Sequence, residues 1–140
     1  MKPTILKLSF ILLLSAFAAA QVPAVPCCDC NEPERSDLIC LSAKGMRDHV
    51  DHIEPLKPSG LGKGLNLSGT VVLEVRFEPN GKVACVRAKS GHPIAISAAM
   101  QAVPKWTFKP AESNGVAKSG CGLIRIKYRL RDKGSSTELK

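Results

Sequence analysis

Residues 71–89 contain the pattern that most restricts the fold, two short strands joined by a tight turn. The apolar residues of the first strand recur at every second position: Val71, Leu73, Val75 and Phe77. This period of two is typical of a strand with one buried face. Pro79, Asn80 and Gly81 suit a bulged turn, because Pro presets its φ angle and Gly accepts the left-handed conformation. Val83–Lys89 then returns as the second strand of an antiparallel hairpin.

The period becomes helical between Ile94 and Val103. One helix face collects the apolar residues Ile96, Ala99, Met100 and Val103. Pro104 ends or kinks this helix, because it has no N–H to donate to a carbonyl one turn earlier. A final alternating strand covers Leu123–Leu130. The order predicts an α+β fold, a three-stranded antiparallel sheet (strand, strand, helix, strand) with the helix on one face and the third strand beside the first.

Residues 1–20 have the pattern of a secretory signal peptide. Lysines precede an apolar stretch, and Ala18–Ala20 offers small residues for cleavage before Gln21. The alternative is an uncleaved membrane anchor. As a helix, the apolar stretch Leu8–Ala20 would span about 20 Å, which is shorter than a bilayer core of roughly 30 Å. We therefore expect an exported protein, periplasmic or secreted, and treat membrane anchoring as the less favoured alternative.

The composition excludes several classes of function. Without Lys2 and Lys7, the exported part has 18 basic and 12 acidic residues, a net charge of +6. With one Trp and one Tyr, it offers little surface on which nucleic-acid bases could stack. No nucleophile-elbow, zinc-protease or phosphate-loop motif is present, and a nucleophile pair of Cys40 and His49 is a weak alternative. We expect no enzyme activity, small-molecule substrate, cofactor or nucleic-acid partner.

The cysteines follow the predicted signal peptide: Cys27, Cys28, Cys30, Cys40, Cys85 and Cys121. An even number in an exported chain predicts disulfides, and the spacing to His49 and His52 fits no zinc pattern, so we expect no metal. In the predicted sheet, Cys85 and Cys121 lie on the face opposite the helix, about 10 Å apart and too distant to pair. Either Cys121 bends out of its strand, or each of the two pairs with a cysteine of the N-terminal extension.

The segments outside the predicted sheet are less regular. Residues 21–54 form a cysteine-rich N-terminal extension, with a helix expected over 36–44 and a strand or loop over 46–54. A charged cluster in this extension is typical of a solvated surface: Asp48, His49, Asp51 and His52. The polar residues 131–140 predict a flexible tail.

The order of elements resembles the carboxy-terminal domain of TonB, the periplasmic end of bacterial energy transducers. The resemblance rests on the hairpin turn Pro79–Gly81, on Ser90–Pro93 leading into a small-residue helix, and on the W-x-F-x-P sequence of Trp106–Pro110. It covers residues 55–130, which we expect to form one domain. It implies a structural core motif of four residues: Gly81, Trp106, Phe108 and Pro110.

TonB-like domains pair a sheet edge with an extended segment of an outer-membrane receptor, a mode known as β-augmentation. The resemblance implies the same role here, with the last strand as the edge and these candidate contacts: Leu123, Arg125, Lys127 and Arg129. The family's receptor-contacting stretch, around Q-P-x-Y-P, corresponds to residues 54–58. Pro55 and Pro58 are retained, whereas Glu54 and Lys57 replace the Gln and the Tyr.

A second hypothesis is a secreted structural or adaptor domain that is braced by disulfides. The sequence shows no retained membrane helix and no long Pro/Lys/Glu-rich linker of the family. We therefore do not expect this chain to transduce protonmotive energy by itself. We expect a protein partner, either a receptor segment or a second copy of the chain joined through the sheet edge; for the second hypothesis the partner is unknown.

Overall fold

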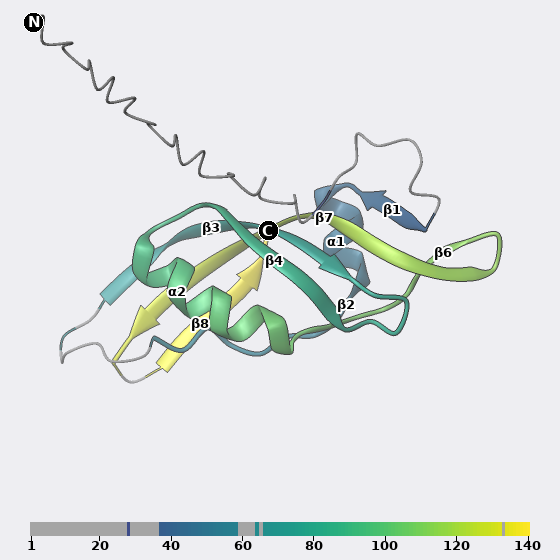
Figure 1. Cartoon of the computed structure of the whole chain (residues 1–140). Coiled ribbons are helices and arrows are strands. Elements are labelled where there is room, and N and C mark those ends of the chain that lie inside the picture. Colours follow the sequence, from purple (N-terminus) through teal and green to yellow (C-terminus); the bar gives the residue numbers. More distant parts are fainter. Residues whose placement is uncertain (1–27, 29–36, 59–63, 65, 133) are drawn as a thin grey trace, which may run out of the picture.

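The computed structural model describes residues 28, 37–58, 64, 66–132 and 134–140 (Figure 1). The predicted signal peptide lies outside these residues, as do Cys27 and Cys30. Within the described part, no helix combines the length and the apolar character needed to cross a membrane.

The elements follow the chain in this order: β1 (Leu38–Leu41), α1 (Ala43–His49), β2 (Val50–His52), β3 (Asn66–Phe77), β4 (Val83–Ser90), α2 (Pro93–Ala102), the 3-10 turn η1 (Val103–Lys105), β5 (Thr107–Phe108), β6 (Ala111–Ser113), β7 (Val116–Arg131) and β8 (Gly134–Leu139). The main sheet has the strand order β1-β7-β3-β4. The strands β6 and β8 also pair with β7, and β2 pairs with β5 in a separate two-stranded sheet.

The predicted centre of the fold is confirmed. Strands β3 and β4 form an antiparallel hairpin, and β7 lies against β3, antiparallel to it. The sheet is nevertheless larger than the three strands predicted. The first half of β7 pairs with β1 in parallel, and its second half pairs with β8. The long β7 therefore lies inside the sheet, because short strands occupy its second edge.

The prediction of a helix over residues 36–44 is wrong. Leu38–Leu41 is the strand β1, and the helix α1 begins after Ser42. The Ser42 side chain caps this helix by accepting a hydrogen bond from Gly45 N at 3.1 Å. The helix therefore begins later than predicted, because Ser42 is a good capping residue. It also extends into residues 46–54, where a strand or loop was expected and where only Val50–His52 forms a strand.

The prediction of a flexible tail is also wrong. Residues 134–139 pair with β7 from Arg131 opposite Gly134 to Ile126 opposite Leu139. Half-buried and exposed residues alternate along β8. A polar segment can form such a strand because main-chain hydrogen bonds to β7 do not depend on its side chains.

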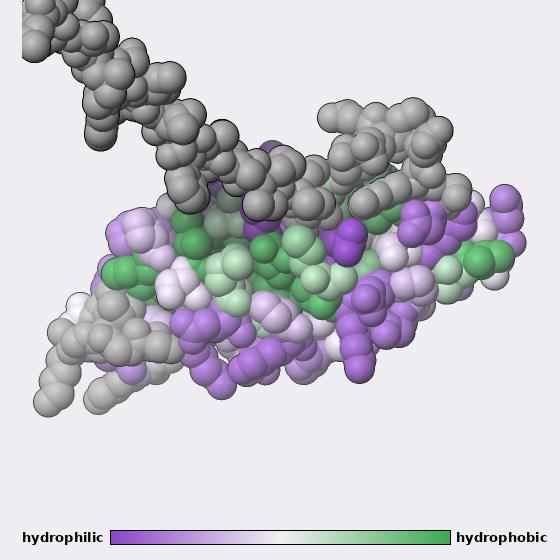
Figure 2. Space-filling view, in the orientation of Figure 1, coloured by the Kyte–Doolittle hydropathy of each residue, from purple (hydrophilic) through white to green (hydrophobic). Residues whose placement is uncertain are grey.

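Helix α2 covers one face of the sheet, as Figure 1 shows. It packs through alanines, Ala95, Ala98, Ala99 and Ala102, which are all buried. The opposing strand contributes Val71, Leu73, Val75 and Phe77, each with no exposed surface. Hydrophobic residues reach the surface in the middle of this side of the molecule, and hydrophilic ones follow its lower margin (Figure 2).

Both ends of α2 follow from local sequence. His92 caps its start, because Nδ1 accepts a hydrogen bond from Ile94 N at 3.3 Å, and Pro93 occupies the first helical position. At the other end Pro104 converts the chain to the 3-10 turn. The helix therefore ends next to Pro104, as the sequence predicted. The turn places the following residue, Trp106, in the core.

The sheet face opposite α2, here named the open face, carries a row of cysteines. Cys40 lies beside Cys121, and Arg76 of β3 separates Cys121 from Cys85, as the alternation pattern predicted. Cys28 forms a disulfide with Cys121, with the Cα atoms 5.8 Å apart. Cys40 and Cys85 are also disulfide-bonded, and the described cysteines include no free thiol. Of the two alternatives, Cys121 therefore pairs with the N-terminal extension.

Candidate functional site

The residues of the W-x-F-x-P sequence pack against the hairpin turn. Trp106 is 1% exposed and Phe108 is 3% exposed, whereas Pro110 lies at the surface. The ring of Phe108 stacks on Phe77 with ring centroids 4.6 Å apart. Phe108 N also donates a 2.8 Å hydrogen bond to the carbonyl of Gly81.

Gly81 is required for this contact on two grounds. Its φ of 82° lies in the left-handed region that favours glycine. A Cβ atom at this position would stand 2.1 Å from the carbonyl oxygen of Phe108, which is a backbone atom. The turn and the Phe108 strand approach each other this closely because residue 81 has no side chain.

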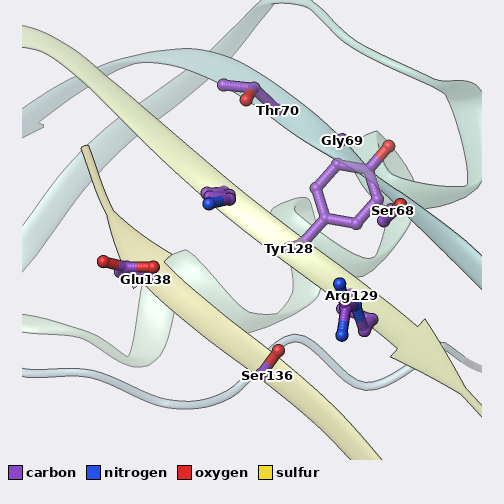
Figure 3. Close-up of a pocket in the computed structure, with 8 residues that line it drawn as sticks. Ser68, Gly69, Thr70, Tyr128, Arg129, Ser136 and Glu138 are labelled. Atoms are coloured by element: carbon purple, nitrogen blue, oxygen red, sulfur yellow. The ribbon is translucent and has the colours of Figure 1, made fainter.

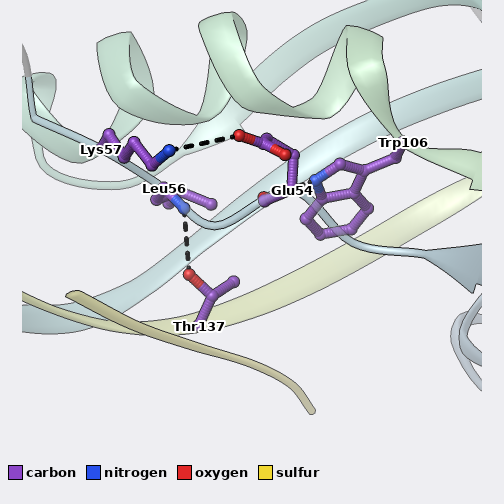
Figure 4. A network of polar contacts seen from close by, with 5 residues as sticks. All are labelled: Glu54, Leu56, Lys57, Trp106 and Thr137. Carbon is purple, nitrogen blue, oxygen red and sulfur yellow. Dashed lines mark hydrogen bonds and ion pairs between the residues drawn. The ribbon is translucent and has the colours of Figure 1, made fainter. Parts of the chain in front are cut away.

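Residues 54–58 are held between the core and β8 (Figure 4). Trp106 Nε1 donates a 2.8 Å hydrogen bond to the carbonyl of Glu54. Leu56 is fully buried, and its N–H donates to Thr137 Oγ1 at 3.1 Å. An exposed ion pair joins Lys57 to Glu54 at 3.5 Å and contributes little, because solvent screens it.

A shallow hollow adjoins this segment on the helix side. Its volume is about 210 Å³, and Pro55 and Lys57 form one wall. The other wall comes from α2 and η1: Ala98, Gln101, Ala102 and Lys105. Exposed polar side chains surround the small side chains of Ala98 and Ala102 in this hollow. Such a surface suits contact with another protein better than enclosure of a small ligand.

Residues 123–130 do not form an edge of the sheet, which corrects the premise behind the binding prediction. One side of this stretch pairs with β3 throughout. On the other side, β8 pairs with residues 126–131, and Lys140 N donates to the Arg125 carbonyl at 2.9 Å. From Arg125 to Leu130, the main chain of β7 is therefore already used on both sides.

The side chains of this stretch do remain accessible. Arg125, Lys127 and Arg129 are exposed on the open face, and Leu123 is 38% exposed. They alternate with residues buried beneath the helices: Ile124, Ile126, Tyr128 and Leu130. Burial raises the pKa of the Tyr128 hydroxyl above its usual value, so this group stays neutral.

An open hollow of about 420 Å³ lies over this part of the sheet. Arg129 of β7 stands between Ser68 of β3 and Ser136 of β8 (Figure 3). By the strand register, Lys127 lies in the same way between Thr70 and Glu138. The lining residues are Ser68, Gly69, Thr70, Lys127, Tyr128, Arg129, Ser136 and Glu138. The hollow therefore combines cations with hydroxyl groups, which together can bind carboxylates.

Strand β8 connects the two candidate regions. Thr137 contacts Leu56 on the helix side, while Ser136 and Glu138 lie opposite Arg129 and Lys127 on the open face. Sequence reasoning missed the residues of β8. The only signal was a weak alternation in a Ser- and Thr-rich stretch, and such a stretch is also typical of a loop.

The weaker chemical alternatives find no support in this arrangement. Cys40 is disulfide-bonded, so it cannot serve as a nucleophile beside His49. His49 Nδ1 instead contacts the carbonyl of Gly45 at 2.7 Å. In the described part of the chain, no three potential metal ligands come together, and the thiol of Cys28 is used by its disulfide.

A hairpin, a covering helix and a long returning strand define a small α+β domain. Residues 63–130 match the family model described as Gram-negative bacterial TonB protein C-terminal. This part of the chain is therefore a domain of the TonB carboxy-terminal family, a family of protein-interaction domains without enzymatic activity. Residues 54–58 lie just before the matched segment. No curated protein and no solved structure matches the chain.

Proposed function

We propose that this protein binds an extended segment of a protein partner by β-strand pairing in the periplasm. The partner fits the periplasmic segment of an outer-membrane receptor, because TonB carboxy-terminal domains interact with such receptors. The disulfides agree with an oxidising compartment. The observation that carries the proposal is the second edge of β7, which is covered only by the short strands β1 and β8 and by Lys140 among the described residues.

The partner segment takes the place of β8 beside β7. Strand β8 is short, and its sequence, Gly-Ser-Ser-Thr-Glu-Leu, contains a single large apolar residue. Leu139 is only half-buried. By contrast, β7 has 16 residues and buries Ile124, Ile126, Tyr128 and Leu130 in the core. A partner with better side-chain complementarity can therefore compete with β8 while β7 stays in place.

Deleting residues 134–140 tests this mechanism. The probe is an array of synthetic peptides that tile the periplasmic segments of outer-membrane receptors from the bacterium that encodes the chain. We expect the full chain to bind selected peptides and the shortened chain to bind the same peptides more tightly, because the internal competitor is gone. Fluorescence anisotropy gives both affinities.

Glu112→Ala on the exposed strand β6 serves as a matched control and should leave the affinity unchanged. Far-UV circular dichroism confirms that the shortened chain is folded. If the shortened chain is folded but no longer binds, the partner contacts β8 itself and not the edge of β7 that β8 covers.

A further inference from the structure

Four cations form a single line along one strand. Arg125, Lys127, Arg129 and Arg131 occupy alternate positions of β7, and all four are exposed. We name them the cationic row. Alternate residues of a strand point to the same face and are about 6.8 Å apart. The row therefore runs along the open face for three such steps.

The structure does not neutralise this row. Among the described residues the ion pairs are Lys44 with Asp48, Lys57 with Glu54, and Lys89 with Glu74. None of them includes a member of the cationic row. On the β3 side the row faces uncharged residues: Asn66, Ser68, Thr70 and Val72. Four neighbouring like charges repel one another, and an anionic partner would relieve this repulsion.

The register shows which positions of an adjacent strand would face the row. In β8, Gly134 lies opposite Arg131, Ser136 opposite Arg129 and Glu138 opposite Lys127. Residues directly opposite in an antiparallel pair are close enough for their side chains to interact. Strand β8 thus has an acidic residue, Glu138, at one of three such positions, and this carboxylate is not in any ion pair of the described residues.

We propose that the cationic row selects an extended partner segment with an acidic residue at every second position. This inference rests on the proposed strand pairing beside β7 and adds the chemistry of the partner. In such a segment the carboxylates fall opposite Lys127, Arg129 and Arg131 in turn. On β3, Ser68 lies opposite Arg129 and Thr70 lies opposite Lys127, so their hydroxyl groups offer further hydrogen bonds to the same segment.

The shape of the charged region favours a peptide over an anionic membrane surface. The row is one strand wide, because β3 places no basic residue beside it between residues 66 and 72. The other basic residues of the open face lie toward the far end of β3 and on β4, where Lys89 pairs with Glu74 and Arg87 lies opposite Glu74. A membrane surface is best matched by a broad basic plane, whereas a single line of charge with a repeat of two residues matches one extended chain.

The test uses the full-length exported protein and labelled seven-residue peptides. One peptide alternates threonine with glutamate, a second alternates threonine with glutamine, and a third has the composition of the first with its glutamates consecutive. We expect the alternating acidic peptide to bind about tenfold more tightly than either of the others, because several cross-strand charge pairs add up. Added salt should weaken only the acidic peptides.

Substitutions then locate the effect. Lys127→Gln and Arg129→Gln should each reduce the ratio of the two affinities, for the alternating acidic peptide over the glutamine peptide. Arg47→Gln removes an equal charge from the exposed surface of α1 and should leave this ratio unchanged. Equal losses with Arg47→Gln would show that net charge, not the row, attracts the peptide.

The outcomes separate this inference from the function on which it rests. If no peptide binds, including the receptor segments, both proposals fail. If the glutamine peptide or the consecutive isomer binds as tightly as the alternating one, pairing survives and the alternating acidic preference is wrong. Binding to phosphatidylglycerol vesicles that needs Arg129, and that acidic peptides do not inhibit, would assign the row to lipid instead.

Discussion

At the scale of the residue, the absence of a side chain decides several contacts. Gly120 accommodates the ring of Phe77, because a Cβ atom there would lie 2.1 Å from it. Gly81 accommodates the backbone of Phe108. The stacked rings of Phe77 and Phe108 therefore depend on two glycines. Gly81 lies in the turn between β3 and β4, and Gly120 lies in β7.

Gly81→Ala should destabilise the protein strongly, by about 3 kcal/mol or more, because backbone strain and a steric clash act together. Gly115→Ala provides a matched control. Its φ of 75° is also positive, yet nothing lies within 4 Å of the added Cβ atom. Strain alone should cost about 1 kcal/mol. Urea unfolding followed by Trp106 fluorescence measures both, and equal losses would contradict the clash.

At the scale of the element, the position of β7 inside the sheet changes the effect of proline. Lys127 lies in a strand that pairs with β3 and with β8. Ser136 lies in β8, which pairs only with β7 within the main sheet. A proline removes a backbone donor and is tolerated better toward an edge.

Lys127→Pro should therefore unfold the domain or cost about 3 kcal/mol or more, because β7 carries much of the core. Ser136→Pro should release β8 and leave the remaining fold intact. Near-UV circular dichroism and hydrogen exchange distinguish the two outcomes. A native spectrum for Lys127→Pro would show that β7 is less important to the sheet than its pairing indicates.

At the scale of the whole molecule, one covalent bond joins distant parts of the chain. The disulfide between Cys28 and Cys121 spans a sequence separation of 93 residues. Closing a loop of this length restricts the unfolded chain severely. The bond also attaches the N-terminal extension to the first half of β7, at the end remote from the proposed binding edge.

Replacing Cys28 and Cys121 together by Ser should reduce the free energy of unfolding by about 2–5 kcal/mol, because the loop constraint is lost. Since the bond lies away from residues 126–131, peptide affinity should change little once the protein is folded. Calorimetry and the peptide assay measure the two quantities separately. A large loss of affinity in the folded double variant would show that the extension takes part in binding.

The pattern of residues along the chain was enough to predict the centre of the fold. Alternation between polar and apolar residues identified β3, β4 and β7, and helical spacing together with Pro104 identified α2 and its end. These signals are local: each depends on residues within one element and on the face that it buries. For the same reason the sequence placed Cys85 and Cys121 on one face and separated them by a strand.

The strands at the edges of this centre became visible only in the folded structure. The strands β1 and β8 form because β7 offers unpaired main-chain groups, and main-chain pairing leaves little trace in side-chain pattern. The same applies to the candidate site. Its cations at Arg125, Lys127 and Arg129 were visible in the sequence, but their neighbours in β8 were not. The neighbour of each edge strand and its register are set by pairing between distant segments of the chain. The alternation of residues within one strand does not reveal this pairing.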